Sequence, residues 1–376
     1  MKTLILIFLL LFTFSSMAQE KKRARDYGIE IGVLNTGVLN AITDVPGVKV
    51  GHQTLIKAEN VRTGVTAILP HSGNIFQSKI PAAIYIGNGF GKLAGISQVK
   101  ELGNLETPII LTNTLSIPVG IQGVVKYTLG LKGNENVQSV NAVVGETNDG
   151  YLNDIRGMHV TESDVITSIE NAKSGPVKEG NVGAGTGTVA FGFKGGIGTS
   201  SRKLPKSVGG YTVGVLVQTN FGGVLSINGA PIGKELNQYP FRNAIEKSDG
   251  SCMIVVLTDA PLDARQLDRV AKRAMMGLAR SGGIASNGSG DYVVAASTAE
   301  NNRTPYQTKG KLDKGDVLRN DAMSPLFMAT IEATEEAIIN SLFAAETMVG
   351  RDEHSINALP LKRVLEILKK YSVIKP

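Results

Sequence analysis

Short apolar runs separated by glycine, asparagine and proline constrain the fold of this chain more than any other feature. They recur from residue 28 to residue 220, whereas the longest patterns with helical spacing lie in the last third of the chain. The chain contains 44 glycines among 376 residues, well above the average of roughly 7%. Because this excess is spread along the chain, it indicates many tight turns and short strands.

The pattern predicts both strands and helices. We expect strands at 42–51 (strand, turn, strand), 66–69, 82–86, 108–112, 140–145, 211–220, 253–258 and 292–296. We expect helices at 93–102, 117–131, 263–280, 325–347 with Ser324 as the N-cap, and 360–370. Such a mixture predicts an α/β protein in which helices cover the faces of sheets, but it does not predict the topology.

The first 18 residues have the layout of a secretory signal peptide. A basic start, Met1-Lys2, precedes an apolar run at 4–14 and the small residues at 16–18. The apolar run is too short to span a bilayer, which needs about 20 residues. We therefore expect an exported protein, periplasmic or secreted, whose mature chain starts near Gln19 and has no further membrane segment.

Several classes of function lack the residues that they need. The net charge is +6 without a basic stripe among aromatic residues, so we expect no nucleic-acid partner. The glycine-rich segment 180–187 lacks the Gly-Lys-Ser/Thr ending of a phosphate loop. Cys252 is the only cysteine, which excludes an internal disulfide. No metal or other cofactor is expected, because the histidines are scattered: His52, His71, His159 and His354.

The tetrapeptide 249–252 joins a polar stretch at 234–250 to an apolar strand at 253–257. It can be an ordinary turn, or it can be a site of autoproteolysis. In the second case the Ser251 hydroxyl attacks the Gly250 carbonyl, and hydrolysis then leaves a serine with both a hydroxyl and an α-amine. Glycine suits the position before the bond because it tolerates a strained backbone and leaves room for the attack.

Two further polar segments have candidate roles. Ser289 and Asp291 lie in the segment 286–291, which is either a simple loop or a polar relay near a nucleophile. Asn220 ends a predicted strand, where its amide can cap a turn or donate to an oxyanion.

Taken together, these segments resemble the DmpA-like aminopeptidases, which include L-aminopeptidase/D-esterases and bacterial β-peptidyl aminopeptidases. The resemblance runs from Asn40 to about Gly350, and many motifs in one order make it specific. Its carriers are residues 40–48, 50–52, 87–93, 105–108, 111–114, 145–154, 180–187, 218–222, 250–251, 258–262 and 289–291.

The resemblance implies a chain that is made inactive and cuts itself before Ser251. The products would be an α chain, residues 19–250, and a β chain, residues 251–376, of one peptidase domain. The implied fold is a four-layer αββα sandwich, shared with ornithine acetyltransferases and similar to N-terminal-nucleophile hydrolases. The heterodimers are expected to form a homotetramer, without a metal.

The resemblance also implies roles for individual residues. Ser251 would be the nucleophile, and its own amine, or Ser289 supported by Asp291, would accept the proton. Some relatives have glutamate at the position of Asp291, and the shorter aspartate reaches less far. Asn220 would donate to the oxyanion.

Two more residues would bind the substrate. Glu146 would hold the free ammonium of a small peptide, amide or ester, and Tyr151 matches a tyrosine near the site in some members. The sequence does not separate β-peptides from L-peptides and D-residue amides or esters. Cys252 is expected to point into the core. The alternatives are an acyltransferase of the ornithine-acetyltransferase type, which uses threonine as its nucleophile, and a non-catalytic exported binding protein.

Overall fold

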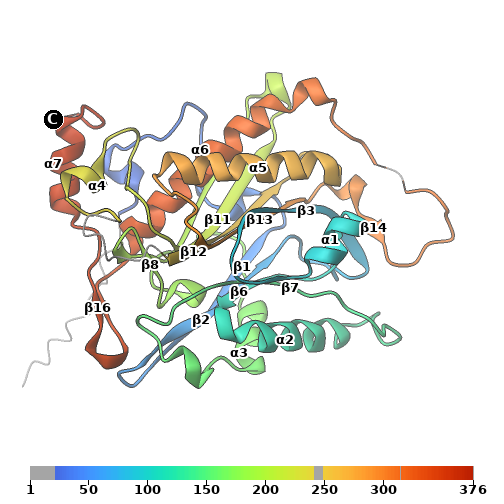
Figure 1. Cartoon of the computed structure of the whole chain (residues 1–376). Helices are drawn as coiled ribbons and strands as arrows, with labels where there is room; N and C mark the ends of the chain where they lie inside the picture. Colours follow the sequence, from blue (N-terminus) through green and yellow to red (C-terminus); the bar gives the residue numbers. More distant parts are fainter. Residues whose placement is uncertain (1–21, 241–248, 314, 376) are drawn as a thin grey trace, which may run out of the picture.

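Two stacked sheets lie between two layers of helices, so the predicted four-layer αββα architecture is confirmed (Figure 1). The computed structural model describes residues 22–240, 249–313 and 315–375. The predicted signal peptide lies outside the described residues. Within the described part of the chain, no helix combines the length and the apolar character needed to cross a bilayer.

The larger sheet carries the strands that surround Ser251. Its order is β10-β11-β12-β13-β3-β14, with β5 paired to β3. β12 and β13 are parallel, and the other pairs are antiparallel. The strands are β3 (Ser78–Gly89), β5 (Asn104–Leu105), β10 (Ile197–Lys203), β11 (Thr212–Asn220), β12 (Asp249–Thr258), β13 (Gly288–Ser297) and β14 (Thr304–Pro305).

The smaller sheet has the order β1-β2-β6-β7-β4. Its strands are β1 (Lys49–Lys57), β2 (Val61–Leu69), β4 (Leu93–Ala94), β6 (Ile109–Asn113) and β7 (Val143–Thr147). Two short hairpins lie outside both sheets: β8 (Val189–Ala190) with β9 (Phe193–Lys194), and β15 (Met348–Val349) with β16 (Ser355–Ile356).

The helices cover the outer faces of the two sheets (Figure 1). α5 (Ala264–Arg280) and α6 (Ser324–Ala344) pack on the larger sheet, while α2 (Ile117–Leu129) and α3 (Glu162–Glu170) pack on the smaller one. The remaining helices are α1 (Ile96–Leu102), α4 (Ile232–Glu235) and α7 (Leu361–Lys370).

β12 shows why this sequence folds into stacked layers. Its apolar run is continuous because both of its faces are buried. Cys252, Ile254 and Val256 point to the helices α5 and α6, whereas Met253 and Val255 point into the core between the sheets. The prediction that Cys252 is a core residue is thereby confirmed, since none of its surface is exposed.

Several local predictions differ from the structure. Residues 42–44 form a 3-10 helix instead of a strand, and the helix expected from residue 93 begins at Ile96, after the short strand β4. α6 ends at Ala344, and its N-cap is Met323, with Ser324 as the first helical residue. The segment 286–291, expected to be a loop, already belongs to β13 from Gly288 onward.

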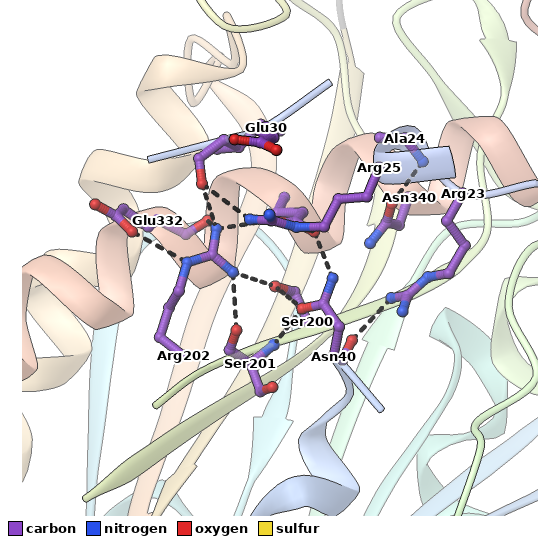
Figure 2. Close-up of polar contacts among 12 residues, drawn as sticks. Arg23, Ala24, Arg25, Glu30, Asn40, Ser200, Ser201, Arg202, Glu332 and Asn340 are labelled. Atoms are coloured by element: carbon purple, nitrogen blue, oxygen red, sulfur yellow. Dashed lines mark hydrogen bonds and ion pairs between the residues drawn. The ribbon is translucent and has the colours of Figure 1, made fainter. Parts of the chain in front are cut away.

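A buried ion network joins α6 to the larger sheet (Figure 2). The Arg202 side chain is fully buried, and its Nε lies 3.0 Å from Glu332 Oε2. Its Nη2 lies 2.7 Å from Glu336 Oε2, and Arg25 Nε lies 2.8 Å from Glu336 Oε1. Two carboxylates on one buried helix are therefore compensated by two guanidinium groups, one of them from the N-terminal segment of the described chain.

We predict that Arg202→Met lowers the free energy of unfolding by about 3–5 kcal/mol, because it leaves Glu332 and part of Glu336 buried without their cation. Arg363→Met is the matched control, since its pair with Glu366 is exposed and should contribute under about 1 kcal/mol. Urea unfolding of both variants measures the difference. Similar stabilities for the two variants would contradict the structural role of Arg202.

Candidate active site

A cavity of about 700 Å³ brings together residues that are far apart in the sequence. Ser251, Asn220, Glu146 and Tyr151 all line it. Ser289 and Asp291 do not belong to its lining, although their neighbour Gly288 does. Four of the six predicted site residues therefore face one space, and the other two lie behind it.

Ser251 lies near the start of β12, between two partner strands. It pairs with Asn220 on β11 and with Gly290 on β13. Its hydroxyl donates to the Gly250 carbonyl oxygen at 2.7 Å and accepts from the Gly290 N–H at 3.2 Å. The hydroxyl is thus held directly against the peptide bond that autoproteolysis would cut.

The structure gives a reason for glycine at position 250 that the sequence did not reveal. Its φ is not positive. A Cβ at this position would lie 2.5 Å from the Cα of Phe221 and 2.8 Å from the carbonyl oxygen of Asn220. The close approach of β11, and not a left-handed backbone, therefore calls for glycine before Ser251.

The orientation of the Asn220 amide is determined by one backbone contact. The Val189 N–H donates to Asn220 Oδ1 at 2.9 Å. Because this contact identifies the oxygen, the NH₂ group of Asn220 remains as the donor. Asn220 lies across the strand pair from Ser251, so its NH₂ group is available to an oxyanion formed there.

A buried lysine that the sequence analysis did not single out shapes this part of the site. The Lys194 side chain has no exposed surface, and its Nζ donates to the carbonyl oxygens of Gly185, Thr188 and Gly195 at 2.8–3.0 Å. These bonds hold the loop that presents the Val189 N–H. The sequence offered one hint of this role, because Lys194 lies within a glycine-dense segment.

Ser289 and Asp291 lie beside the backbone around Ser251, not beside the Ser251 hydroxyl. They pair with Gly250 and Cys252, so the strand pleat turns their side chains to the helix-covered face, away from the Ser251 hydroxyl. Both side chains are buried, and within the described residues neither has a partner that meets hydrogen-bond geometry. Such unsatisfied buried groups are typical of functional sites.

The carboxyl of Asp291 titrates unusually. Burial raises its pKa from 3.8 to about 6, although the nearby Ser289 hydroxyl and the Cys252 N–H favour the charged form. Burial also raises the pKa of the Cys252 thiol well above its usual value, and the charge of Asp291 adds to this effect. Burial therefore keeps the Cys252 thiol protonated in the core, next to Ser251.

Glu146 forms an acidic site in the wall of the cavity. Its side chain is nearly buried at the end of β7. Oε1 accepts from the Lys92 N–H at 3.0 Å and lies 3.3 Å from Lys92 Nζ, while Oε2 accepts from the Thr114 hydroxyl. The carboxylate is thus oriented by fixed donors, and one of its partners is the half-exposed ammonium of Lys92.

Tyr151 forms another part of the wall. Its ring stacks on His354, with ring centroids 4.5 Å apart and an interplanar angle of 13°. The Tyr151 carbonyl oxygen also contacts His354 Nδ1 at 2.9 Å.

No histidine is among the described residues that line the cavity, so a catalytic pair of serine and histidine has no support there.

Comparison with known proteins decides the family. The profile described as "Peptidase family S58" matches residues 40–356. The chain belongs to Peptidase family S58. This membership confirms the predicted family resemblance and the prediction of a hydrolase.

Individual S58 relatives match over nearly their whole length. Beta-peptidyl aminopeptidase BapA of Sphingosinicella microcystinivorans is 42% identical over 374 residues, covering 94% of this chain and 93% of the relative. A beta-aminopeptidase of Burkholderia sp. is 40% identical, with a TM-score of 0.87 and coverage of 94% and 100%. The L-aminopeptidase D-Ala-esterase/amidase of Ochrobactrum anthropi, described as a variant of the Ntn hydrolase fold, is 37% identical, with a TM-score of 0.85 and coverage of 93% and 99%.

We predict a pH dependence of stability that comes from Asp291. Because its pKa is higher in the folded protein, the folded state binds more protons, and its contribution to stability is lost as the pH rises through about 6. Between pH 4.5 and 7.5 this loss should be about 2 kcal/mol. The test uses the Ser251→Ala protein, which should remain uncut. Adding Asp291→Asn to this protein should remove the pH-dependent loss of stability.

Urea unfolding of the Ser251→Ala protein with and without Asp291→Asn measures this effect at several pH values. As the pH rises above 6, the protein with Asp291 should lose stability relative to the Asp291→Asn protein. A difference that stays constant over this range would contradict the raised pKa of Asp291.

Proposed function

We propose that this S58 peptidase is a self-processing serine aminopeptidase whose nucleophile is Ser251. The observation that carries the proposal is the position of the Ser251 hydroxyl. It faces the cavity and lies 2.7 Å from the carbonyl oxygen of Gly250. This position supports a role for one side chain both in scission of the preceding bond and in later attack on a substrate.

Self-cleavage would proceed through an ester. Ser251 Oγ attacks the carbonyl carbon of Gly250, the bond from that carbon to the Ser251 nitrogen breaks, and the nitrogen takes up the hydroxyl proton. Water then hydrolyses the ester. The products are a carboxylate at Gly250 and a Ser251 that carries both a free amine and a free hydroxyl.

In turnover the same hydroxyl would attack the carbonyl carbon of a substrate. The new amine of Ser251 would accept the proton. Ser289 and Asp291 lie beside the backbone of β12 where this amine appears, so they would support the amine in that role. The NH₂ group of Asn220 would donate to the oxyanion. The proton then passes to the leaving amine, and water hydrolyses the acyl-enzyme.

The preferred substrates would be short peptides with a free N-terminal ammonium bound by Glu146. We propose β-peptides as the first substrates to test, since relatives at 42% and 40% identity are described as β-peptidyl or β-aminopeptidases. L-peptides and D-residue amides or esters are the comparison set. An acyltransferase of the ornithine-acetyltransferase type and a binding protein are disfavoured by the matching peptidase relatives.

Export and assembly belong to the same proposal. Residues 1–18 would direct export to the periplasm or the medium and would be removed near Gln19. The α chain, residues 19–250, and the β chain, residues 251–376, would remain associated because two strand pairs of one sheet join them: β11 with β12, and β3 with β13. These heterodimers would assemble into a homotetramer.

We predict that the purified mature protein contains two chains and that the smaller one begins at Ser251. Intact mass under denaturing conditions measures this directly. Ser251→Ala should remain one chain and lose peptidase activity, while Cys252→Ala should still be cut because its side chain points away from the cavity. A single uncut chain from folded wild-type protein would refute self-processing.

We predict that Glu146→Gln raises KM about tenfold or more for substrates with a free ammonium, because a neutral amide forms a weaker contact with a cation. The effect on kcat should be smaller. The kinetics of an aminoacyl p-nitroanilide measure both parameters. An unchanged KM would show that another group binds the ammonium.

A further inference from the structure

The cavity is much larger than the side chain and ammonium of one aminoacyl residue require. Its volume is about 700 Å³, within the range of sites for drug-sized ligands. Besides the carboxylate of Glu146, the described part of its lining carries two cationic side chains, Lys92 and Arg351. A substrate with a negative charge at one end would therefore find a complementary partner.

The two cations differ in what they already contact. Lys92 Nζ lies 3.3 Å from Glu146 Oε1, so its charge is used within the acidic site. Arg351 pairs through Nη1 with Asp352, at 2.9 Å, but the side chain of Asp352 is two-thirds exposed. Such a solvent-exposed pair contributes little and is easily exchanged. Arg351 Nη2 makes no hydrogen bond or ion pair with a described residue.

Arg351 is also held in place. It follows β15, and its Nε donates to the Gly150 carbonyl oxygen at 2.7 Å while its N–H donates to the Leu152 carbonyl oxygen at 2.8 Å. Gly350 approaches this turn so closely that a Cβ would lie 2.0 Å from the Leu152 oxygen. The stacked pair of Tyr151 and His354 fixes the other side of the turn.

We propose that Arg351 binds the C-terminal carboxylate of the substrate and makes dipeptides with a free C-terminus the preferred class. A guanidinium with one nitrogen already oriented and another available is well suited to a carboxylate. The ammonium at Glu146 and the carboxylate at Arg351 would define the two ends of the substrate. The inference rests on the proposed aminopeptidase function.

Binding to the uncut Ser251→Ala protein tests this inference without requiring catalysis. Titration calorimetry would compare β-alanyl-L-alanine and L-alanyl-L-alanine with their C-terminal amides. We expect each free acid to bind about tenfold more tightly than its amide. Adding Arg351→Gln should reduce this ratio to about one, whereas Arg351→Lys should keep part of it. Equal affinities for acid and amide in the Ser251→Ala protein would overturn the proposal.

Turnover by the cut wild-type protein supplies the second readout. The ratio of kcat/KM for acid over amide should fall in Arg351→Gln, while a loss of local structure alone would lower both rates and leave the ratio unchanged. Lys92→Gln is the matched control, and a ratio that collapses there instead would overturn the proposal. Selective binding without turnover of any peptide would support the role of Arg351 and refute the proposed aminopeptidase function.

Discussion

The pairing of β12 with its two neighbours is the constraint on which the site depends. An antiparallel partner on one side and a parallel partner on the other place Asn220 and Gly290 across from Ser251. The hydroxyl, its N–H donor and the amide of Asn220 therefore come together through backbone register alone. Since a shift of one residue would turn every side chain of a strand to the opposite face, the same register also keeps Cys252 in the core.

Close backbone approach explains much of the glycine content around the site. Gly250 lies against Phe221, and Gly290 leaves room for the carbonyl oxygen of Phe90, to which a Cβ would come within 2.2 Å. These contacts bring the strands and loops near enough for one N–H to reach the Ser251 hydroxyl. The glycines are therefore part of the packing that forms the cavity and not merely turn residues.

Charge is distributed unevenly between the core and the cavity. Arg202 and its carboxylate partners are fully buried and join α6 to the sheet, so they stabilise the frame without facing substrate. Among the described residues Asp291 has no such cation as a partner, and its burial raises its pKa. Glu146 and Arg351, which carry opposite charges, both line the cavity, and this suits a substrate with an ammonium and a carboxylate.

The sequence alone determined the class of the fold and pointed to a hydrolase. Continuous apolar runs predicted buried strands such as 253–258, and helical spacing predicted α5 and α7. The junction at Gly250-Ser251, together with the order of the motifs, indicated a candidate nucleophile. These signals are local, so a single sequence can contain them. Local pattern failed at 42–44 and 286–291, where contacts with distant strands decided the backbone.

Only the tertiary structure decided which side chains share the cavity. Arg351 lies 100 positions from Ser251 and has no local motif, so only the docking of its hairpin against Gly150 reveals it. The same applies to Lys194, whose three acceptors come from a folded loop. The strand pleat turns the side chains of Ser289 and Asp291 away from the Ser251 hydroxyl. The face on which a side chain lies depends on the strand register, and the spacing of residues in the sequence does not reveal that register.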